Sequence, residues 1–289
     1  MATRKFGGPN GYGHVSDPVD HKKTSFRVMR MKLATVFAAL ATLPQTIDFK
    51  PFVVGNGGPG IINQKATSSC TGHATGGSVT TRMAIVGAPV ELVSPIGSYA
   101  LSRALDRIPN ADGSLPPLTD DGAMPNQNMR ALVEFGCPPA SVWGNYPADP
   151  ATINDEPTIK ELEAASAFEM TGFYAIDSTG DQKILDIMTA LAAGFPVCFA
   201  VQVDSDFENY VSGVVGAPNP NDILGGHYIY AVGYSYDGKD PKSIEVTFVN
   251  SWDTTWGEGG FGRGNADFIA GMSDLYVMDV HAKAADQAA

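Results

Sequence analysis

The stretch "NQKATSSCTGHATGG", residues 63–77, decides how the rest of the chain is interpreted. It places Cys70 behind small polar residues and ahead of glycines and threonines, which are weak helix formers. A helix from Cys70 to about residue 86 would need tertiary packing, and its small residues would let neighbouring elements approach closely. A thiol at a helix start lies near the positive end of the helix dipole, which favours the thiolate. The stretch therefore predicts a reactive cysteine, if other parts of the chain supply its partners.

The composition is that of a globular protein with one large domain, or two that share a core. Of the 289 residues, 44% are apolar and 17% are charged. The formal net charge of −12 argues against binding to a nucleic-acid backbone. Three cysteines, Cys70, Cys137 and Cys198, are too few for a disulfide scaffold, so we expect free thiols and a reducing compartment.

The sequence was searched for membrane-spanning segments and signal peptides. No apolar run reaches the eighteen or so residues that a membrane helix needs, so we expect no membrane span. The polar N-terminus has no signal-peptide core. The apolar run at 31–44 is similar to a short signal peptide, but 30 residues precede it, so we interpret it as a segment that leads into the domain. We therefore expect a cytoplasmic or virion-associated protein rather than a classically secreted one.

The residue pattern predicts an α+β protein with two segregated lobes. Helical patterns dominate the first half, and short runs rich in Val, Tyr, Phe and Ile dominate the second. An active site between the two lobes is the natural expectation. The segment at 43–54 is predicted to be extended. The predicted helices cover residues 70–86, 94–107, 128–136, 158–168 and 181–194.

We divide the chain into an N-terminal extension at 1–42, a main domain at 43–280 and a C-terminal tail at 281–289. The second half of the extension is apolar and would be costly to expose, so it must pack on the body or on a protein partner. The extension is thus either similar to a pro-segment or a docking arm. We expect it to pack on the body away from the cleft, because it shows no extended, substrate-like stretch beside a glycine-rich hinge.

Several common kinds of active site are missing from the sequence. It has no GxSxG, HExxH or GxxxxGK[ST] motif and no CxxC pair, so we expect neither a metal nor a cofactor. Among the histidines, His73 lies three residues after Cys70 and would leave no room for a substrate between them. His227 begins a strong strand pattern behind two glycines, but a histidine there could equally be an ordinary bonded residue.

A third group follows downstream. Asn250 ends a strand pattern and is followed by Trp252 and Trp256. A buried amide flanked by indoles could fix the tautomer of a neighbouring imidazole and shield that bond from water, although two tryptophans are also ordinary core residues. A cysteine near the start, then a histidine and an asparagine near the end, occur in this order.

With these blocks together, the chain resembles the papain family of cysteine peptidases over residues 43–280. "NQKATSSCTGHA" is similar to the family's Gln-x5-Cys block, "GGHYIYAVGY" to its histidine block and "VNSWDTTWGEGGFGRG" to its asparagine block. "LPQTIDFKP" resembles the start of the mature domain. The form of the cysteine block is closer to bacterial and viral members than to lysosomal cathepsins. The resemblance implies a helical lobe packed against an antiparallel, β-barrel-like lobe, with the cleft between them.

The resemblance also implies roles for individual residues. Cys70 is the nucleophile as a thiolate paired with protonated His227, Asn250 orients His227, and Trp252 shields their bond. Gln64 and the Cys70 backbone N–H form the oxyanion hole. Trp256 is part of the same block.

Three residues depart from the family pattern. Thr71 replaces the usual aromatic after the nucleophile, Thr67 replaces a cysteine so that a family disulfide cannot form, and Asp253 replaces a glycine. None of them removes a catalytic group.

The resemblance implies a cysteine endopeptidase that acts on peptide or protein substrates. The alternative is a structural or assembly protein, such as a virus particle component, built on the same fold with or without activity. The complete set of Cys70, His227, Asn250 and Gln64 favours the enzyme.

Overall fold

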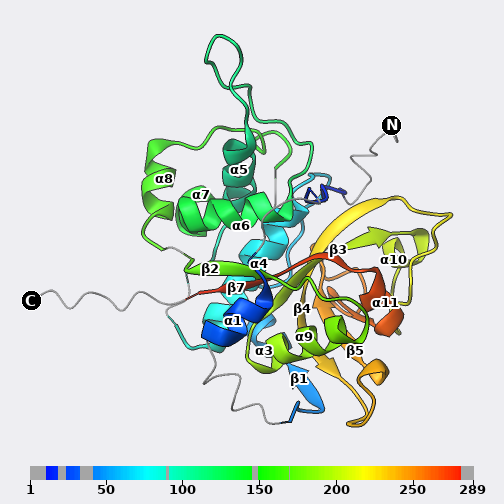
Figure 1. Cartoon of the computed structure of the whole chain (residues 1–289). Helices are drawn as coiled ribbons and strands as arrows, with labels where there is room; N and C mark the ends of the chain where they lie inside the picture. Colours follow the sequence, from blue (N-terminus) through cyan, green and yellow to red (C-terminus); the bar gives the residue numbers. More distant parts are fainter. Residues whose placement is uncertain are drawn as a thin grey trace, which may run out of the picture.

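The structure is a computed structural model and describes residues 11–18, 24–32, 42–88, 91–144, 149–168 and 170–280. Helices gather in one lobe and an antiparallel sheet forms the other, with α4 (Cys70–Ile85) between them (Figure 1). The predicted α+β class with two lobes is confirmed. Among the described residues, no helix is long and apolar enough to cross a membrane.

The helical lobe follows the start signals in the sequence. The helix at α5 begins after Ser94, whose Oγ accepts a hydrogen bond from Gly97 N at 3.0 Å, and α8 begins with a capping box between Thr158 and Glu161. The helix predicted from 128 begins earlier, because Pro125 fits the first helical turn. The helices of this lobe are α5 (Pro95–Asp106), α6 (Pro125–Glu134), α7 (Ala140–Trp143) and α8 (Ile159–Ala165).

The other lobe is built on a seven-stranded antiparallel sheet in the order β2-β7-β3-β4-β5-β6, with β1 also paired to β4. The sheet is open rather than closed into a barrel, with β2 and β6 at its ends. The strands are β1 (Thr46–Asp48), β2 (Gly172–Ala175), β3 (Val197–Val203), β4 (Gly225–Ser235), β5 (Glu245–Val249), β6 (Phe261–Gly264) and β7 (Ser273–Asp279). Further helical elements complete the lobe: α3 (Lys50–Val54), α9 (Gly180–Ala192), α10 (Ser205–Glu208), η1 (Pro241–Ser243) and α11 (Ala266–Gly271).

One local expectation is wrong. The segment at 43–54 was expected to be extended, but only β1 is a strand and residues 50–54 form α3. Pro51 lies in the first turn of α3, where its missing N–H costs nothing. The prolines that suggested an extended chain are therefore compatible with a helix start.

The central helix α4 is stable because it is packed on nearly every side. Fourteen of its sixteen residues are buried. A Cβ added at Gly72 would lie 2.2 Å from the Pro95 carbonyl oxygen, and one at Gly77 would lie 2.9 Å from the Tyr230 ring. The small residues thus let α5 and β4 approach the helix backbone, as the sequence predicts.

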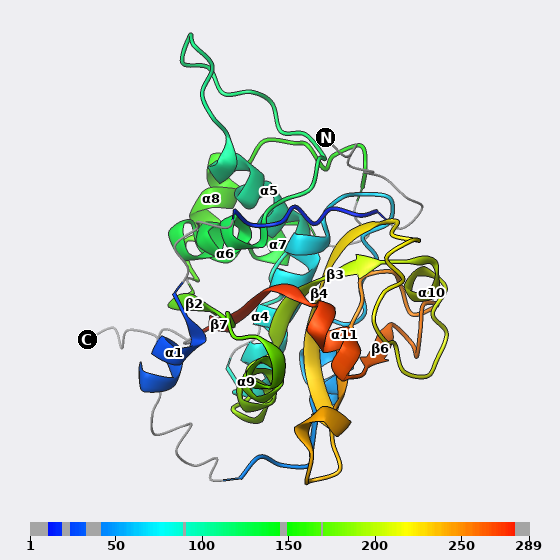
Figure 2. The same cartoon turned by 45° about the vertical axis from the view of Figure 1, so that its right-hand side comes forward.

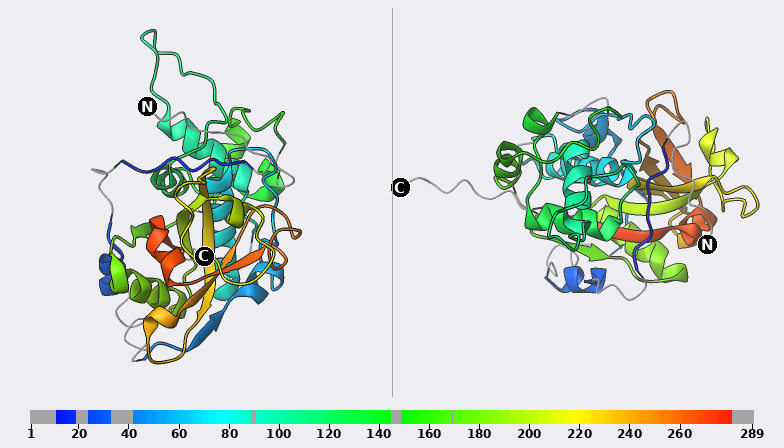
Figure 3. Two further views of the ribbon diagram at one scale, coloured as in Figure 1. Left: turned by 90° about the vertical axis from the view of Figure 1, so that its right-hand side faces the viewer. Right: turned by 90° about the horizontal axis from the view of Figure 1, so that it is seen from above.

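Part of the N-terminal extension belongs to the body. Phe26 and Met29 of α1 (Phe26–Lys32) are buried in the core of the β lobe. Just before α1, the Thr24 carbonyl accepts a hydrogen bond from Ala175 N of the end strand β2 at 2.7 Å. In Figure 3 (left), this helix lies apart from residues 11–18. Residues 33–41 of the apolar run and the tail at 281–289 lie outside the described residues.

Candidate active site

Cys70 is the first residue of α4 and is fully buried. The loop before it is held by its own side chains, since Thr67 Oγ1 donates to the Gln64 carbonyl at 2.6 Å and lies 2.6 Å from Ser69 Oγ. The backbone N–H groups of Tyr228 and Gly13 point to the Cys70 sulfur. The thiol therefore lies where the helical lobe meets β4, next to the residue that follows His227.

His227 is the third residue of β4, and its ring is fixed by two partners. Its Nε2 lies 2.8 Å from Oδ1 of Asn250, which directly follows β5. The indole of Trp252 stacks on the imidazole, with centroids 4.5 Å apart and planes at 22°. Both His227 and Asn250 are buried, so water cannot compete for this bond. Trp256 packs edge-on against Trp252, with ring centroids 5.9 Å apart, and so helps to hold the Trp252 indole in place.

Gln64 lies beside this group with a fixed side chain. Its Oε1 accepts a hydrogen bond from Ser251 Oγ at 2.6 Å, which determines where its amide group points. Its Nε2 donates to two carbonyl oxygens, those of Thr67 and Gly11, each at 3.0 Å. One N–H thus holds the cysteine loop, and the other holds a carbonyl from another part of the chain.

Residues 11–18 of the extension cross the site. The segment runs between the helical lobe and the strands (Figure 2), and the view from above agrees (Figure 3, right). Gly13 and Val15 pair with Ala123, through Ala123 N to Gly13 O at 3.0 Å and Val15 N to Ala123 O at 3.1 Å. On the other side, His14 N donates to the Gly226 carbonyl at 3.3 Å. The expectation that the extension avoids the cleft is therefore wrong for these residues.

Two glycines allow this close approach. A Cβ at Gly11 would lie 2.0 Å from the Thr67 carbonyl oxygen, and a Cβ at Gly13 would lie 1.7 Å from the Ser68 carbonyl oxygen. Gly11 also has a φ of +66°, which favours glycine. Glycine at 11 and 13, alternating with Tyr12 and His14, was the signal in the sequence that could have identified this segment.

His73 lies in the same helix as Cys70 and bonds locally. Its Nδ1 lies 2.9 Å from the Ser69 carbonyl oxygen, and burial lowers its pKa to about 4. This is the environment of a structural histidine. It supports the choice of His227 as the partner of Cys70.

The departures from the family pattern have local explanations. Asp253 adopts a φ of 74°, which aspartate tolerates better than most residues, and its carboxylate accepts a hydrogen bond from Asn63 Nδ2 at 3.1 Å. Next to Thr67, which stands where the family pattern has a cysteine, Ser68 N donates to both carboxylate oxygens of Asp120, at 3.0 and 3.1 Å. Tyr99 OH also donates to Asp120, at 2.9 Å, and accepts from Gly122 N. The cysteine loop is thus linked to the strand-like segment that pairs with residues 13–15. All three cysteines are free and buried.

Comparisons with known proteins agree with this fold. A sequence profile of the papain family of cysteine proteases matches residues 142–274. An uncharacterised peptidase C1-like protein of Acanthamoeba polyphaga mimivirus is 30% identical over 155 residues, which are 49% of this chain and 46% of that protein. Xylellain, a cysteine protease from Xylella fastidiosa, has a similar fold, with a TM-score of 0.74 at 22% identity over 97% of this chain and 100% of that one. The chain is thus similar to papain-like cysteine peptidases in part of its sequence and in its fold.

A further relative covers more of this papain-like chain. A cathepsin B-like protein of Giardia intestinalis is 28% identical over 228 residues, which are 76% of this chain and 68% of that protein. The match to the mimivirus protein spans about half the length of that relative. The similarity extends over most of the chain, and the activity of this chain is a matter for proposal.

In this papain-like site, burial favours the neutral forms of both reactive groups. It raises the pKa of Cys70 to about 12, although the N–H groups of Gly13, Tyr228 and Thr71 act in the opposite direction. Burial also lowers the pKa of His227 to about 3, while its bond to Asn250 raises it. The sequence predicted a thiolate–imidazolium pair. In the covered site the thiol and the neutral imidazole are favoured instead, because charge separation needs solvation that burial removes.

Proposed function

We propose that this chain is a cysteine endopeptidase whose cleft is covered by residues 11–18. The observation that carries the proposal is that a polypeptide already lies across the candidate site. The Gly11 carbonyl accepts a hydrogen bond from Gln64, and the Gly13 N–H points to the Cys70 sulfur. A site that holds backbone in this way can hold a peptide substrate once the segment leaves.

The reaction then follows from the positions of four groups. Once the cleft opens to water, a proton moves from the Cys70 thiol to His227, and the thiolate attacks the carbonyl carbon of a peptide bond. The negative charge that develops on the oxygen is stabilised by Gln64 Nε2 and the Cys70 backbone N–H. His227 then protonates the leaving amine, and a thioester remains on Cys70. Water, deprotonated by His227, hydrolyses the thioester and regenerates the thiol.

The path of the covering segment supports cleavage within a chain. Gly13 bonds to the Cys70 sulfur, while Tyr12 before it bonds to Glu208 and His14 after it bonds to Asp274, so the segment continues in both directions from the thiol. The cleft therefore has room for polypeptide on both sides of a scissile bond, which an endopeptidase needs.

The segment itself is bound in a way that opposes its own cleavage. The backbone N–H of Gly13 is a hydrogen-bond donor to the Cys70 sulfur, and the neutral state of the pair lowers the reactivity of the thiol. We propose that the extension acts as a pro-segment-like cover rather than as a docking arm.

The test is covalent labelling of the full-length chain with an epoxide or vinyl-sulfone electrophile, followed by mass mapping and assay with internally quenched peptides. We expect label on Cys70 but not on Cys137, and we expect Cys70→Ser to abolish both labelling and turnover. The matched control, Cys137→Ser, should change neither. Absence of labelling and turnover even after the cleft is opened by substitution in residues 11–18 would favour the structural or assembly protein.

A further inference from the structure

A carboxylate that the proposed reaction does not use fixes the loop that leads to Cys70. The backbone N–H of Ser68, two residues before the thiol, donates to both carboxylate oxygens of Asp120, at 3.0 and 3.1 Å. Hydrogen bonds to an ionised acceptor are roughly twice as strong as those between neutral groups. Ser68 is buried, so water does not readily replace this partner if it is lost. Asp120 therefore fixes the backbone next to the proposed nucleophile.

Asp120 is itself held in place by side chains of α5. The hydroxyl of Tyr99, a fully buried residue, donates to the Asp120 carboxylate at 2.9 Å. The guanidinium of Arg103 lies 3.8 Å from the centroid of the Tyr99 ring and donates to the Thr119 carbonyl oxygen at 2.7 Å. Arg103 thus supports both the tyrosine and the residue before Asp120. The carboxylate cannot rotate away from Ser68 without losing its bond to the tyrosine.

Tyr99 also connects this carboxylate to a segment that binds polypeptide. Its hydroxyl oxygen accepts a hydrogen bond from Gly122 N at 3.0 Å. The next residue, Ala123, donates from its N to the Gly13 carbonyl at 3.0 Å, and its own carbonyl accepts from Val15 N at 3.1 Å. The loop before Cys70 and the segment at 122–123 are therefore joined through one tyrosine and one carboxylate.

Both proposed oxyanion donors depend on the backbone that Asp120 fixes. Gln64 Nε2 donates to the carbonyl oxygen of Thr67, the residue before Ser68, at 3.0 Å. The other donor is the backbone N–H of Cys70, two residues after Ser68. A displacement of Ser68 would therefore change the positions of both donors. An oxyanion hole needs its donors at hydrogen-bond distance from the developing charge, so even a small displacement lowers the rate.

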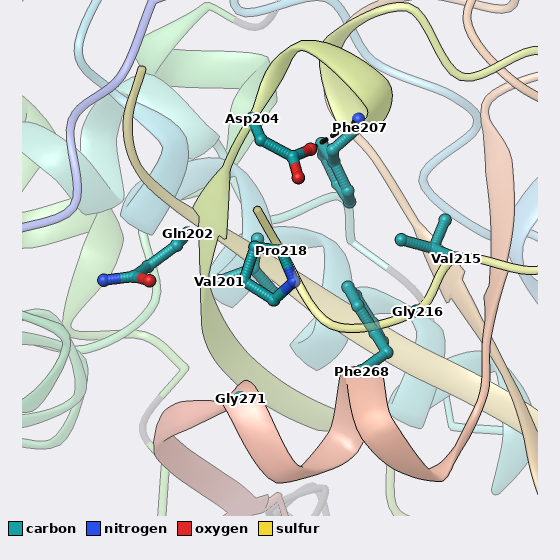
Figure 4. Close-up of a pocket in the computed structure, with 9 residues that line it drawn as sticks. All are labelled: Val201, Gln202, Asp204, Phe207, Val215, Gly216, Pro218, Phe268 and Gly271. Carbon is teal, nitrogen blue, oxygen red and sulfur yellow. Dashed lines mark hydrogen bonds between the residues drawn. The ribbon is translucent and has the colours of Figure 1, made fainter. Parts of the chain in front are cut away.

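Other candidates in the described part of the chain are weaker. Figure 4 shows a hollow lined by apolar side chains such as Val201, Phe207 and Phe268, but its volume of about 10 Å³ holds one water molecule at most.

We infer that Asp120 is a positioning residue: through Ser68 it aligns the two oxyanion donors, and through Tyr99 it sets them relative to the segment at 122–123. The inference rests on the proposed peptidase activity. The segment at 122–123 pairs with polypeptide in the cleft, so the network places a bound backbone and the oxyanion donors in one frame. Asp120 thus acts on the reaction through these backbone groups.

The first test separates turnover from the reactivity of the thiol. Full-length chain carrying Gly13→Ala, which should open the cleft, is assayed with internally quenched peptides and with iodoacetamide. Asp120→Asn keeps the shape of the side chain but removes its charge, so kcat should fall by about tenfold. Alkylation of Cys70 needs no oxyanion hole and should change by less than about twofold. Asp121→Asn, the same change at the exposed neighbouring residue, is the control and should alter neither rate. An unchanged kcat in Asp120→Asn, or an equal fall of kcat and alkylation, overturns the inference.

The second test needs no turnover. Native-state hydrogen exchange in the full-length chain reports how often each amide N–H opens to water. Asp120→Asn should raise the exchange rate of Ser68 N–H by about tenfold, because a charged acceptor is lost, and that of Gly122 N–H by about threefold through the shared tyrosine. Tyr99→Phe should act in the reverse order, mainly on Gly122 N–H and more weakly on Ser68 N–H. If each variant changes only the N–H that it bonds directly, the two parts of the site are not coupled and the inference is overturned.

The two tests separate the inference from the activity on which it rests. If the Gly13→Ala chain cleaves no peptide although its Cys70 is alkylated, the proposed peptidase fails, and the exchange rates still decide whether Asp120 couples the two parts of the site. If peptide is cleaved and Asp120→Asn has the kcat of its parent, the activity stands and the inference fails.

Discussion

The Gly11 carbonyl oxygen accepts a hydrogen bond from Nε2 of Gln64 at 3.0 Å, so the cover uses the donor proposed for the oxyanion of the reaction. The same donor also bonds to the Thr67 carbonyl, and Ser251 fixes the amide from the other end. The Gly11 carbonyl and the oxyanion of the proposed reaction therefore compete for the Gln64 amide. Mutations can separate these two roles of Gln64.

Gly13→Ala should open the cleft. Its Cβ would lie 1.7 Å from a backbone oxygen of Ser68, which cannot move without disturbing the cysteine loop, so the segment must leave instead. We expect Cys70 alkylation and peptide turnover to rise by about tenfold or more, as for the loss of roughly 1.4 kcal/mol of binding. The control is Gly216→Ala, where the nearest atom to an added Cβ is 3.8 Å away. Equal rates in wild type and Gly13→Ala would show that the segment does not limit access.

Gln64→Ala should separate binding of the cover from catalysis. In the Gly13→Ala background we expect turnover to fall by roughly ten- to a thousandfold, the usual range for the loss of one oxyanion donor. Alkylation of Cys70 by iodoacetamide should persist, because that reaction needs no oxyanion hole. In this variant, kcat reports the loss of the oxyanion donor, and the alkylation rate reports access to the Cys70 thiol. Unchanged kcat would mean that Gln64 does not face the substrate carbonyl.

Two truncations should differ in stability. Removal of residues 1–18 takes away the cover, so turnover should rise while the melting temperature changes little. Removal of residues 1–42 also takes away Phe26 and Met29, whose burial is worth about 1.5–3 kcal/mol each. We expect this shorter chain to melt well below the first, because the β-lobe core opens beside β2. Identical thermal unfolding of the two chains would contradict the packing of α1 on the body.

Stability should fall in mild acid. Burial lowers the pKa of His73 to about 4 and that of His227 to about 3, both below the ordinary value of 6.5 in the unfolded chain. The unfolded state therefore binds protons first, and stability that is complete above about pH 6.5 is lost as the pH falls toward the folded values. Between pH 7 and pH 5 the free energy of unfolding should fall by roughly 2 kcal/mol for each of these histidines.

Urea unfolding at pH 7, 6 and 5 measures this loss as a change in the free energy of unfolding. His73→Gln removes one titrating group from the helix, so its stability should fall less steeply with acid than that of wild type. A slope identical to that of wild type would show that His73 is not held neutral in the folded chain.

The sequence was sufficient for much of the fold and for the grouping of the candidate site. Cys70 begins a helix and His227 lies near the start of a strand because local signals, a run of small residues and two glycines, agree with the tertiary packing. Asn250 directly follows β5, and the antiparallel pairing of β4 with β5 places it close to His227, 23 positions earlier in the chain. Strong local patterns and a fixed pairing rule make such features predictable.

Other features depend on surfaces that only the folded chain creates. Residues 11–18 have no periodic pattern, and their position depends on the backbone of Ser68, Ala123 and Gly226. The pKa of Cys70 likewise follows from burial under those residues, which outweighs the helix-start effect expected from the sequence. The helix at 50–54 was missed because Pro51 is compatible with both an extended chain and a first helical turn.

The link from Ser68 to Asp120 has a consequence for where such a protein can work. A disulfide from position 67 would open in a reducing environment, whereas the two hydrogen bonds of the neighbouring Ser68 N–H to a carboxylate do not respond to glutathione or thioredoxin. The loop that carries Cys70 can thus keep its shape under the reducing conditions that keep the thiol itself unoxidised. The loop should respond to pH rather than to reductants. Burial raises the pKa of Asp120, and a protonated carboxyl group would bind the Ser68 N–H less strongly.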